Sequence, residues 1–245
     1  MFKEYLKEIR SEESKCKKLT QLKFKNELNF FNNFLYFYTD QLKMTRICQH
    51  SRFSVQENPI FLLNVRIIKS FFCANNLVKK GYYNEAIVIQ RSIYESIYLC
   101  KYLIKNPKLA VKWSKGERFS PSTVAKDLEI SQDMKKIYDT FCEFTHPNVS
   151  SIADLITIEK RSLIYEDFQK RDTTVIHTCP IFNEELSFGS IQYQLVFLQM
   201  ASDNFFEFFK DKNWKDVNIS HRKRRNELQE EFFKIVASWK GSISG

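Results

Sequence analysis

The chain has 245 residues and a formal net charge of +9 at pH 7, and it contains 23 Phe and 11 Tyr but only 5 Gly and 5 Pro. Few helix-breaking residues and many large apolar side chains suit long helices packed on one another; they exclude an all-β fold, which needs a turn residue roughly every 8–12 positions. The positive charge favours polyanionic partners, because neutralised phosphates release counterions, although the 29 acidic residues spread among the basic ones leave solubility as an equally simple explanation.

The N-terminal part carries an apolar stripe with the three- and four-residue spacing of a coiled coil. Its members are Leu28, Phe31, Leu35, Tyr38 and Leu42. Such a stripe predicts a long helix that associates with another helix, so a homo-oligomer is expected. The pattern breaks before Asn58-Pro59, which marks a helix start. We therefore divide the chain into residues 1–58, an N-terminal helix and linker, and residues 59–245, a helical bundle domain.

Two amphipathic helices are expected next, between residues 59 and 105. The first ends with the basic Lys80 in its last turn and Gly81 directly after it. The second ends before Asn106-Pro107. Because only a short connection separates the two helices, they should form an antiparallel hairpin. The predicted fold class is all-α, a multi-helix bundle around this central hairpin.

The C-terminal half is less regular. Residues 108–131 lack a clear period apart from a short helix at 122–128. Further helices are expected at residues 134–145, 187–210 and 221–239. Residues 163–165 and 173–176 have strand character, since they are mostly β-branched or aromatic, and this allows one small β-hairpin.

Several common chemistries have no motif in this chain. The six cysteines lie at least 25 residues apart, so zinc-ribbon and thioredoxin-like Cys-x-x-Cys sites are excluded. A phosphate-binding Gly-rich loop, a His-Glu-x-x-His zinc motif and a Gly-x-Ser-x-Gly elbow are also missing, so no metal and no cofactor is expected. No segment offers 18 uncharged apolar residues, and the N-terminus lacks a signal-peptide pattern. We therefore expect no membrane contact and a cytoplasmic location.

Arg91 and Glu95 are the first candidate site residues. They lie four positions apart and share one face of a helix, which is not the face of the apolar Ile93 and Ile97. A charged pair on a helix with apolar or aromatic residues on two sides costs desolvation and needs partners. The pair is either part of an active site or a structural ion pair that fixes the register of the helix.

His146 is the second candidate. Pro147 disfavours helical geometry at the preceding residue, so His146 should lie at the C-terminal end of a helix. Helix carbonyls at that end stabilise a protonated imidazole, which suits a general acid or base near neutral pH. A His that caps the helix and bonds a loop carbonyl is the structural alternative.

A basic run before the last helix is the third candidate. It consists of Arg222, Lys223, Arg224 and Arg225, directly after His221. At the start of a helix these charges would face the unfavourable end of the helix dipole, which favours a phosphate or acidic partner and predicts nucleic-acid binding. A solvated basic turn before an amphipathic helix explains the run equally well.

Four short segments carry a family pattern. They read GYYNEA at 81–86, QRSIYE at 90–95, Trp113 followed by KGERF at 115–119, and YDTFCEFTHP at 138–147. Together they resemble an uncharacterised family of bacterial helical proteins, the domain-of-unknown-function 5677 family, over roughly residues 60–210. The polar positions of that family are an Arg, a Glu four residues later and a His before Pro. They correspond here to Arg91, Glu95 and His146.

The helical hairpin is also similar to the HEPN superfamily, which includes metal-independent ribonucleases of toxin–antitoxin and phage-defence systems. HEPN nucleases carry an Arg and, a few residues later on the same helix, a His; the Arg stabilises phosphate charge and the His helps to move the proton of the ribose 2′-hydroxyl. Arg91 has no His at that spacing. Arg171 and His177 have the spacing of the HEPN pair, but they flank a β-branched stretch that predicts strand or loop. A second near-match, Arg46 and His50, lies in the linker.

These resemblances imply an effector that binds RNA or acts on it, in phage defence or in a toxin–antitoxin pair with an antitoxin protein as partner. It would be a metal-independent ribonuclease in which Arg91 binds phosphate, His146 is the acid or base, and Glu95 orients one of them. The alternative is a non-catalytic helical protein-interaction module in which the same three residues form a buried polar network.

Overall fold

The computed structural model describes residues 2–48, 53–145, 156–159, 173–176, 180–209 and 217–242. Within these residues the elements, in chain order, are α1 (Phe2–Lys23), α2 (Lys25–Cys48), α3 (Glu57–Lys80), α4 (Tyr83–Lys105), α5 (Pro107–Ser114), α6 (Pro121–Asp127), α7 (Gln132–Thr145), β1 (Ile156–Glu159), β2 (Thr173–Ile176), α9 (Glu184–Phe209) and α10 (Val217–Ser242). The predicted fold class is confirmed: the chain forms an all-α bundle of many helices.

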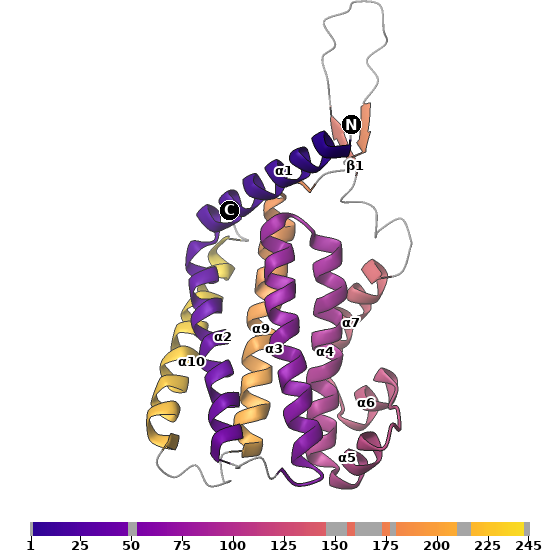
Figure 1. The fold of residues 1–245 in the computed structure, drawn as a ribbon, viewed down its shortest axis with the longest axis vertical. Coiled ribbons are helices and arrows are strands. Elements are labelled where there is room, and N and C mark those ends of the chain that lie inside the picture. Colours follow the sequence, from indigo (N-terminus) through magenta and orange to yellow (C-terminus); the bar gives the residue numbers. More distant parts are fainter. Residues whose placement is uncertain are drawn as a thin grey trace, which may run out of the picture.

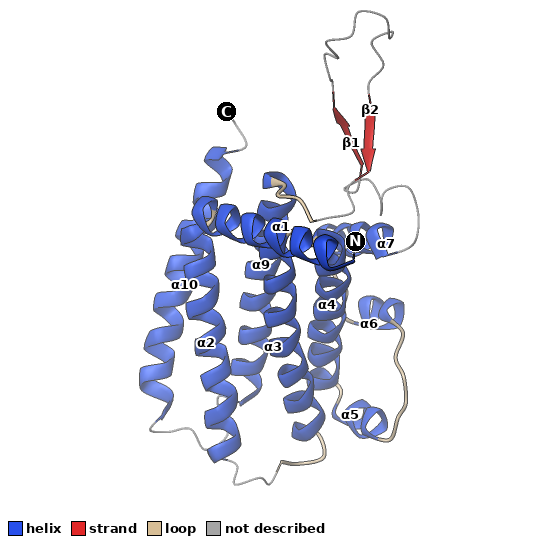
Figure 2. Cartoon of the chain, turned by 45° about the horizontal axis from the view of Figure 1, so that its top comes forward, coloured by secondary structure: helices blue, strands red, loops and turns tan. Residues whose placement is uncertain are grey.

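The long helices lie side by side along the bundle. In Figure 1 their order across the view is α10, α2, α9, α3 and α4, and α1 crosses one end of this row. The shorter helices α5, α6 and α7 flank the outer side of α4 (Figure 2). Helix α4 therefore lies between the core helices α3 and α9 on one side and α7 on the other.

Helices α3 and α4 form the expected antiparallel hairpin, which has the most extensive contact between elements of the described chain. The turn is a Schellman motif, in which the N–H of Tyr82 donates to the carbonyl of Leu77 (3.0 Å) and that of Gly81 to Val78 (3.1 Å). Gly81 has a φ of 86°, which a residue with a side chain rarely adopts. The break that the sequence placed at Gly81 is therefore confirmed.

The N-terminal apolar stripe is buried within this chain. Its five members, Leu28, Phe31, Leu35, Tyr38 and Leu42, are at most 6% exposed and belong to the common core. Helix α2 packs against α3 and α9, so these helices cover the stripe that was expected to meet another copy. The core thus continues across residue 58, where the sequence suggested a boundary. A homo-oligomer stays a prediction, but this stripe no longer supports it.

A buried polar chain crosses the core from α2 to α4. Tyr38 Oη donates to Asn64 Oδ1, and Asn64 Nδ2 lies 2.7 Å from the carbonyl oxygen of Ile60 and 3.3 Å from Cys100 Sγ. Burial raises the pKa of Cys100 to about 12, so its thiol is neutral at physiological pH. The contacts satisfy these buried polar groups and fix the register of three neighbouring helices.

Two C-terminal segments differ from the sequence prediction in their secondary structure or strand pairing. Residues 108–114 were expected to be irregular, but they belong to α5, which begins at Pro107 because its fixed φ favours the first helical position. Strand β2 lies where it was expected, but it pairs antiparallel with β1, with Ile156 opposite Ile176. The expected partner, residues 163–165, lies outside the described residues.

Helix α3 is long and apolar enough to cross a membrane by length and composition, and no other helix of the described ranges meets this criterion. It also lies in the middle of the bundle, where Ile60, Phe71 and Val78 are fully buried. Burial between neighbouring helices accounts for the apolar character of α3.

The Gly81→Ala substitution tests the packing at the hairpin turn. A Cβ at this position would lie 2.8 Å from the carbonyl oxygen of Ile181 and 3.0 Å from Cys16 Sγ. The clash and the left-handed φ together should lower the free energy of unfolding by roughly 2 kcal/mol or more, and the melting temperature by roughly 4–8 °C. Gly116→Ala is the matched control, because Gly116 has a φ of 95° and nothing lies within 4 Å of a Cβ there. Equal losses at the two positions would contradict the close packing at Gly81.

Candidate functional site

Helix α4 presents different chemistry on different faces. Ala86, Ile93 and Ile97 are at most 1% exposed and belong to the core, as the sequence indicated. The Arg91 and Glu95 side chains lie on another face and meet residues of α7. The core side of α4 is closed by α3 and α9, and the face that carries Arg91 and Glu95 meets α7.

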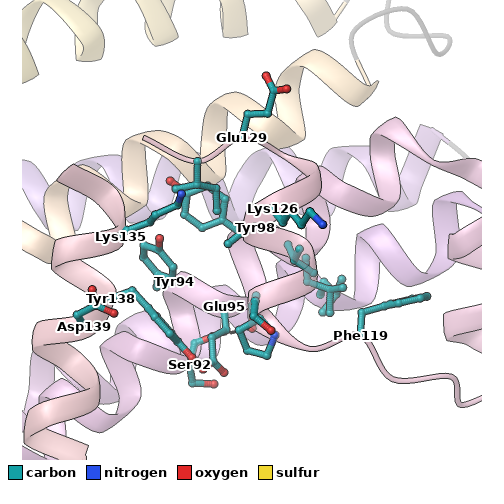
Figure 3. A pocket seen from close by; sticks show the side chains of 18 of the residues that line it. Ser92, Tyr94, Glu95, Tyr98, Phe119, Lys126, Glu129, Lys135, Tyr138 and Asp139 are labelled. Atoms are coloured by element: carbon teal, nitrogen blue, oxygen red, sulfur yellow. Dashed lines mark hydrogen bonds between the residues drawn. The ribbon is translucent and has the colours of Figure 1, made fainter. Parts of the chain in front are cut away.

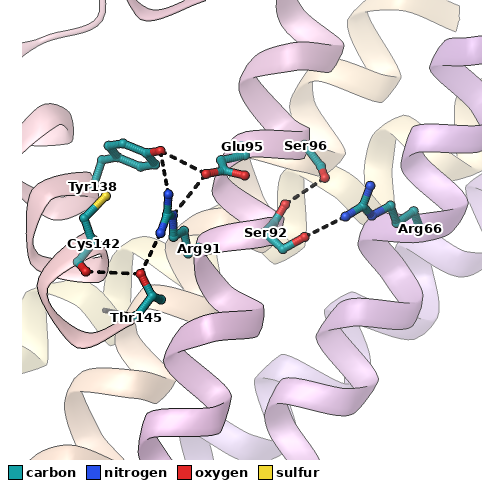
Figure 4. Close-up of polar contacts among 8 residues, drawn as sticks. All are labelled: Arg66, Arg91, Ser92, Glu95, Ser96, Tyr138, Cys142 and Thr145. Carbon is teal, nitrogen blue, oxygen red and sulfur yellow. Dashed lines mark hydrogen bonds and ion pairs between the residues drawn. The ribbon is translucent and has the colours of Figure 1, made fainter. Parts of the chain in front are cut away.

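Four side chains form a polar cluster between α4 and α7, which we call the Arg91 cluster (Figure 4). Arg91 donates from Nε to Glu95 Oε1 (3.1 Å), from Nη1 to Thr145 Oγ1 (2.6 Å) and from Nη2 to the hydroxyl of Tyr138 (3.2 Å). Tyr138 in turn donates to Glu95 Oε1 (2.9 Å). Thr145 donates to the carbonyl of Cys142 (3.1 Å). The guanidinium is therefore held at all three of its nitrogens.

The Arg91 cluster is only partly covered. The side chains of Arg91 and Glu95 are 26% and 35% exposed, so the network is half-buried and water reaches it. The guanidinium carbon also lies 5.3 Å from the centre of the Tyr138 ring, which adds a cation–π contact. Burial raises the pKa of Tyr138 to about 12, and its hydrogen bond to Glu95 acts in the same direction. Tyr138 is thus a hydroxyl donor at neutral pH and not a base.

The Arg91 cluster adjoins a pocket of about 1010 Å³, which we call the aromatic pocket (Figure 3). Its aromatic lining consists of Tyr94, Tyr98, Trp113, Phe119 and Tyr138. Tyr94 stacks on Tyr138, with ring centres 5.3 Å apart, and Phe119 lies at the other end of the lining. A pocket of this size, lined by aromatic and aliphatic side chains together with polar and charged ones, suits a small ligand that has both apolar and polar parts.

Three cations line the same pocket, namely Arg66, Lys126 and Lys135. Arg66 donates to the hydroxyl of Ser92 (2.9 Å), and within the described ranges none of the three forms an ion pair. Glu95 also lines the pocket, and only its Oε1 atom bonds to other described side chains. Among the described residues, the site therefore combines apolar walls, three cations without an acidic partner and one carboxylate oxygen that accepts no hydrogen bond.

Other expected site residues cannot be placed. His146 directly follows the last residue of α7 in the sequence and lies outside the described residues, as do Arg171, His177 and His50. In the part of the chain that the structure does describe, no group of three or more His, Cys, Asp or Glu side chains could hold a metal ion.

The basic run lies inside a helix and does not open it. Helix α10 begins at Val217, so the run starts in its second turn, and the expected conflict with the helix dipole is correspondingly weaker. Arg222, Lys223 and Arg224 are exposed, and Arg224 pairs with Glu227 one turn later (3.1 Å). These three residues form an exposed basic segment of α10.

Arg225 differs from the rest of the basic run. Its guanidinium donates twice to Asp203 Oδ1 of α9, at 2.6 and 3.2 Å, and lies 4.2 Å from the centre of the Phe206 ring. Only 15% of its side chain is exposed. Arg225 therefore joins α10 to α9, and a phosphate would have to compete with Asp203 for it.

Sequence reasoning predicted the helix that carries Tyr138 and Thr145 but gave neither residue a role at the site. They are seven residues apart, which puts their hydroxyls on the same face of α7. This seven-residue spacing was the feature of the sequence from which a polar helix face opposite Arg91 could have been predicted. The aromatic pocket left no such sign, because its walls come from separate helices.

Comparisons with protein-family models, with curated proteins and with solved structures find no significant match to this chain.

Tyr138→Phe tests the contribution of the Arg91 cluster to stability. The change removes a donor to Glu95 and an acceptor for Arg91 while it keeps the ring, so the free energy of unfolding should fall by about 1–2 kcal/mol and the melting temperature by roughly 2–8 °C. Tyr36→Phe is the matched control, because Tyr36 is 63% exposed and makes no hydrogen bond to a described residue. Indistinguishable thermal melts of the two variants would show that the cluster contributes nothing measurable.

Proposed function

We propose that this chain binds single-stranded RNA at the aromatic pocket and the Arg91 cluster, and acts on it as a HEPN-like effector. The observation that carries the proposal is the juxtaposition of five aromatic side chains with three cations that have no acidic partner among the described residues. Single-stranded nucleic acids bind where bases can stack on aromatic rings and phosphates can meet cations. The net charge of +9 supports the same class of partner.

In the proposed reaction Arg91 stabilises charge on the phosphate, and Glu95 orients Arg91 through the bond to Nε. His146 acts as the general acid or base that moves the proton of the ribose 2′-hydroxyl. No metal takes part, so the reaction belongs to the metal-independent ribonucleases that the HEPN resemblance implies. The exposed Arg222, Lys223 and Arg224 add a second basic surface for flanking phosphates.

The wider setting belongs to the same proposal. A toxin–antitoxin pair or a phage-defence system in the cytoplasm would employ such a nuclease, and an antitoxin protein would hold it inactive. A second copy of the chain, as in a homo-oligomer, would extend the basic surface. The resemblance of the helical hairpin to the HEPN superfamily supports this assignment.

A second candidate function has one specific observation in its favour. All three nitrogens of Arg91 already bond to Glu95, Thr145 and Tyr138, as expected of a polar lock that fastens α7 to α4. On this hypothesis the chain is a non-catalytic helical module that presents a surface to a protein partner. The polar lock and the ribonuclease predict different effects of substitutions on RNA cleavage and on the melting temperature.

RNA binding is tested with a fluorescent single-stranded oligoribonucleotide in the presence of a metal chelator, by anisotropy over a range of salt concentrations. Lys135→Gln should weaken binding and reduce the slope of log K against log salt by about 0.7, the value for one lost phosphate contact on a single strand. Lys136→Gln is the matched control: Lys136 is the next residue on α7, is 78% exposed, faces Asp133 and does not line the pocket. Identical slopes for both variants would show that the pocket is not part of the surface that binds RNA.

Cleavage separates the two candidates. For a ribonuclease, His146→Ala should abolish metal-independent cleavage of the same RNA in a gel assay and leave the melting temperature nearly unchanged. For a polar lock, the wild-type chain cleaves nothing, and Arg91→Ala lowers the melting temperature by several degrees. Absence of both RNA binding and cleavage in the wild-type chain would refute the ribonuclease proposal.

A further inference from the structure

The two oxygens of the Glu95 carboxylate are in different situations. Oε1 accepts from Arg91 Nε at 3.1 Å and from the Tyr138 hydroxyl at 2.9 Å. Oε2 receives no hydrogen bond from any described residue, and the Glu95 side chain lines the aromatic pocket. The Arg91 cluster thus fixes the carboxylate by one oxygen and leaves the other as a hydrogen-bond acceptor beside the pocket (Figure 4).

Flat apolar surfaces surround this acceptor. In Figure 3 Tyr94, Tyr98 and Tyr138 lie on one side of Glu95, and Phe119 lies on the other. Tyr94 and Tyr98 are only 5% and 6% exposed, so they offer little ring surface to a base. Stacking therefore falls to the partly exposed Trp113, Phe119 and Tyr138. The volume of about 1010 Å³ admits a nucleobase together with its sugar. Stacking on such rings tolerates every base, so the rings provide affinity without selecting a base.

We infer that Glu95 Oε2 reads the exocyclic amino group of a base held in the aromatic pocket, so that adenine and cytosine are accepted and bases with a carbonyl at that position are rejected. This inference rests on the proposed RNA binding. An ionised carboxylate has acceptors only, so it pairs with an amino group and repels a carbonyl oxygen. Glu95 is a specificity-determining residue in this assignment.

The cations of the pocket orient the bound nucleotide, because they attract its phosphate. Lys126 and Lys135 line the pocket without an ion pair to a described residue, so their charges are available to a phosphate of the ligand. The other lining carboxylates, Glu129 and Asp139, are exposed and make no hydrogen bond or ion pair to described residues. Glu95 is the lining carboxylate that the Arg91 cluster holds in one orientation, and a fixed acceptor discriminates better than a mobile one.

Substitution by glutamine should reverse the preference. In Glu95→Gln the amide oxygen is the atom that can accept from Arg91 and Tyr138, so the amide nitrogen takes the place of Oε2. The pocket would then present a donor where the wild-type chain presents an acceptor. A carbonyl-bearing base should gain affinity and an amino-bearing base should lose it.

The experiment measures binding of two matched pairs of nucleoside monophosphates by isothermal titration calorimetry. CMP and UMP differ in an amino group against a carbonyl on a pyrimidine, and AMP and IMP differ likewise on a purine. The wild-type chain should bind the amino member of each pair about tenfold more tightly, the usual effect of one hydrogen bond to a charged group. Glu95→Gln should invert both ratios. Glu129→Gln, which makes the same charge change at an exposed lining residue, should leave them unaltered.

A parallel titration with oligo(A), oligo(C) and oligo(U) separates this inference from the proposed function. Equal affinities within the wild-type pairs, unchanged ratios in Glu95→Gln, or no nucleotide binding at all would overturn the role of Glu95. RNA binding without base preference would leave the proposed function standing and remove the inference. If the chain discriminates among mononucleotides but binds no oligonucleotide, the role of Glu95 in base selection stands and the proposed RNA binding is refuted.

Discussion

The packing of α4 between other helices is the constraint from which the site follows. Its core face is closed by α3 and α9, and Ile93 and Ile97 leave no room there for a charge. Arg91 and Glu95 lie on another face of α4 and meet the amphipathic helix α7. A guanidinium at such a half-buried position needs a hydrogen-bond partner for each nitrogen, and Tyr138 and Thr145 supply what Glu95 alone cannot.

The parts of the fold with local signals were predictable from sequence. Gly81 and Asn106-Pro107 interrupt the helical period on either side of α4, and the hairpin follows from these breaks alone. The stripe through Leu28 and Tyr38 correctly predicted a buried helix face, but helices of the same chain cover this face, so it gives no support to the homo-oligomer that stays a prediction. Periodicity shows that a face is buried and does not show what covers it, and here the cover comes from α3 and α9.

Only the half of the candidate site that lies on α4 could be predicted from the sequence. The spacing of Arg91 and Glu95 predicts a pair on one face of a helix, and the structure joins them at 3.1 Å. The contacts to Tyr138 and Thr145 lie 47 and 54 residues away along the chain, and no local pattern encodes which helix will meet Arg91. The basic run shows the same limit, since the sequence treats Arg224 and Arg225 alike, whereas packing exposes the first and covers the second.

The turn at Gly81 also bears on the order in which the chain folds. The Schellman bonds of this turn are local and can form as soon as α3 and α4 meet. Its contact with Ile181, in contrast, closes a loop of about 100 residues, and the entropy of loop closure delays such contacts. The α3–α4 hairpin is therefore expected to act as the folding nucleus, onto which the segment before α9 docks late. During synthesis the hairpin would be complete before the helix that covers it has left the ribosome.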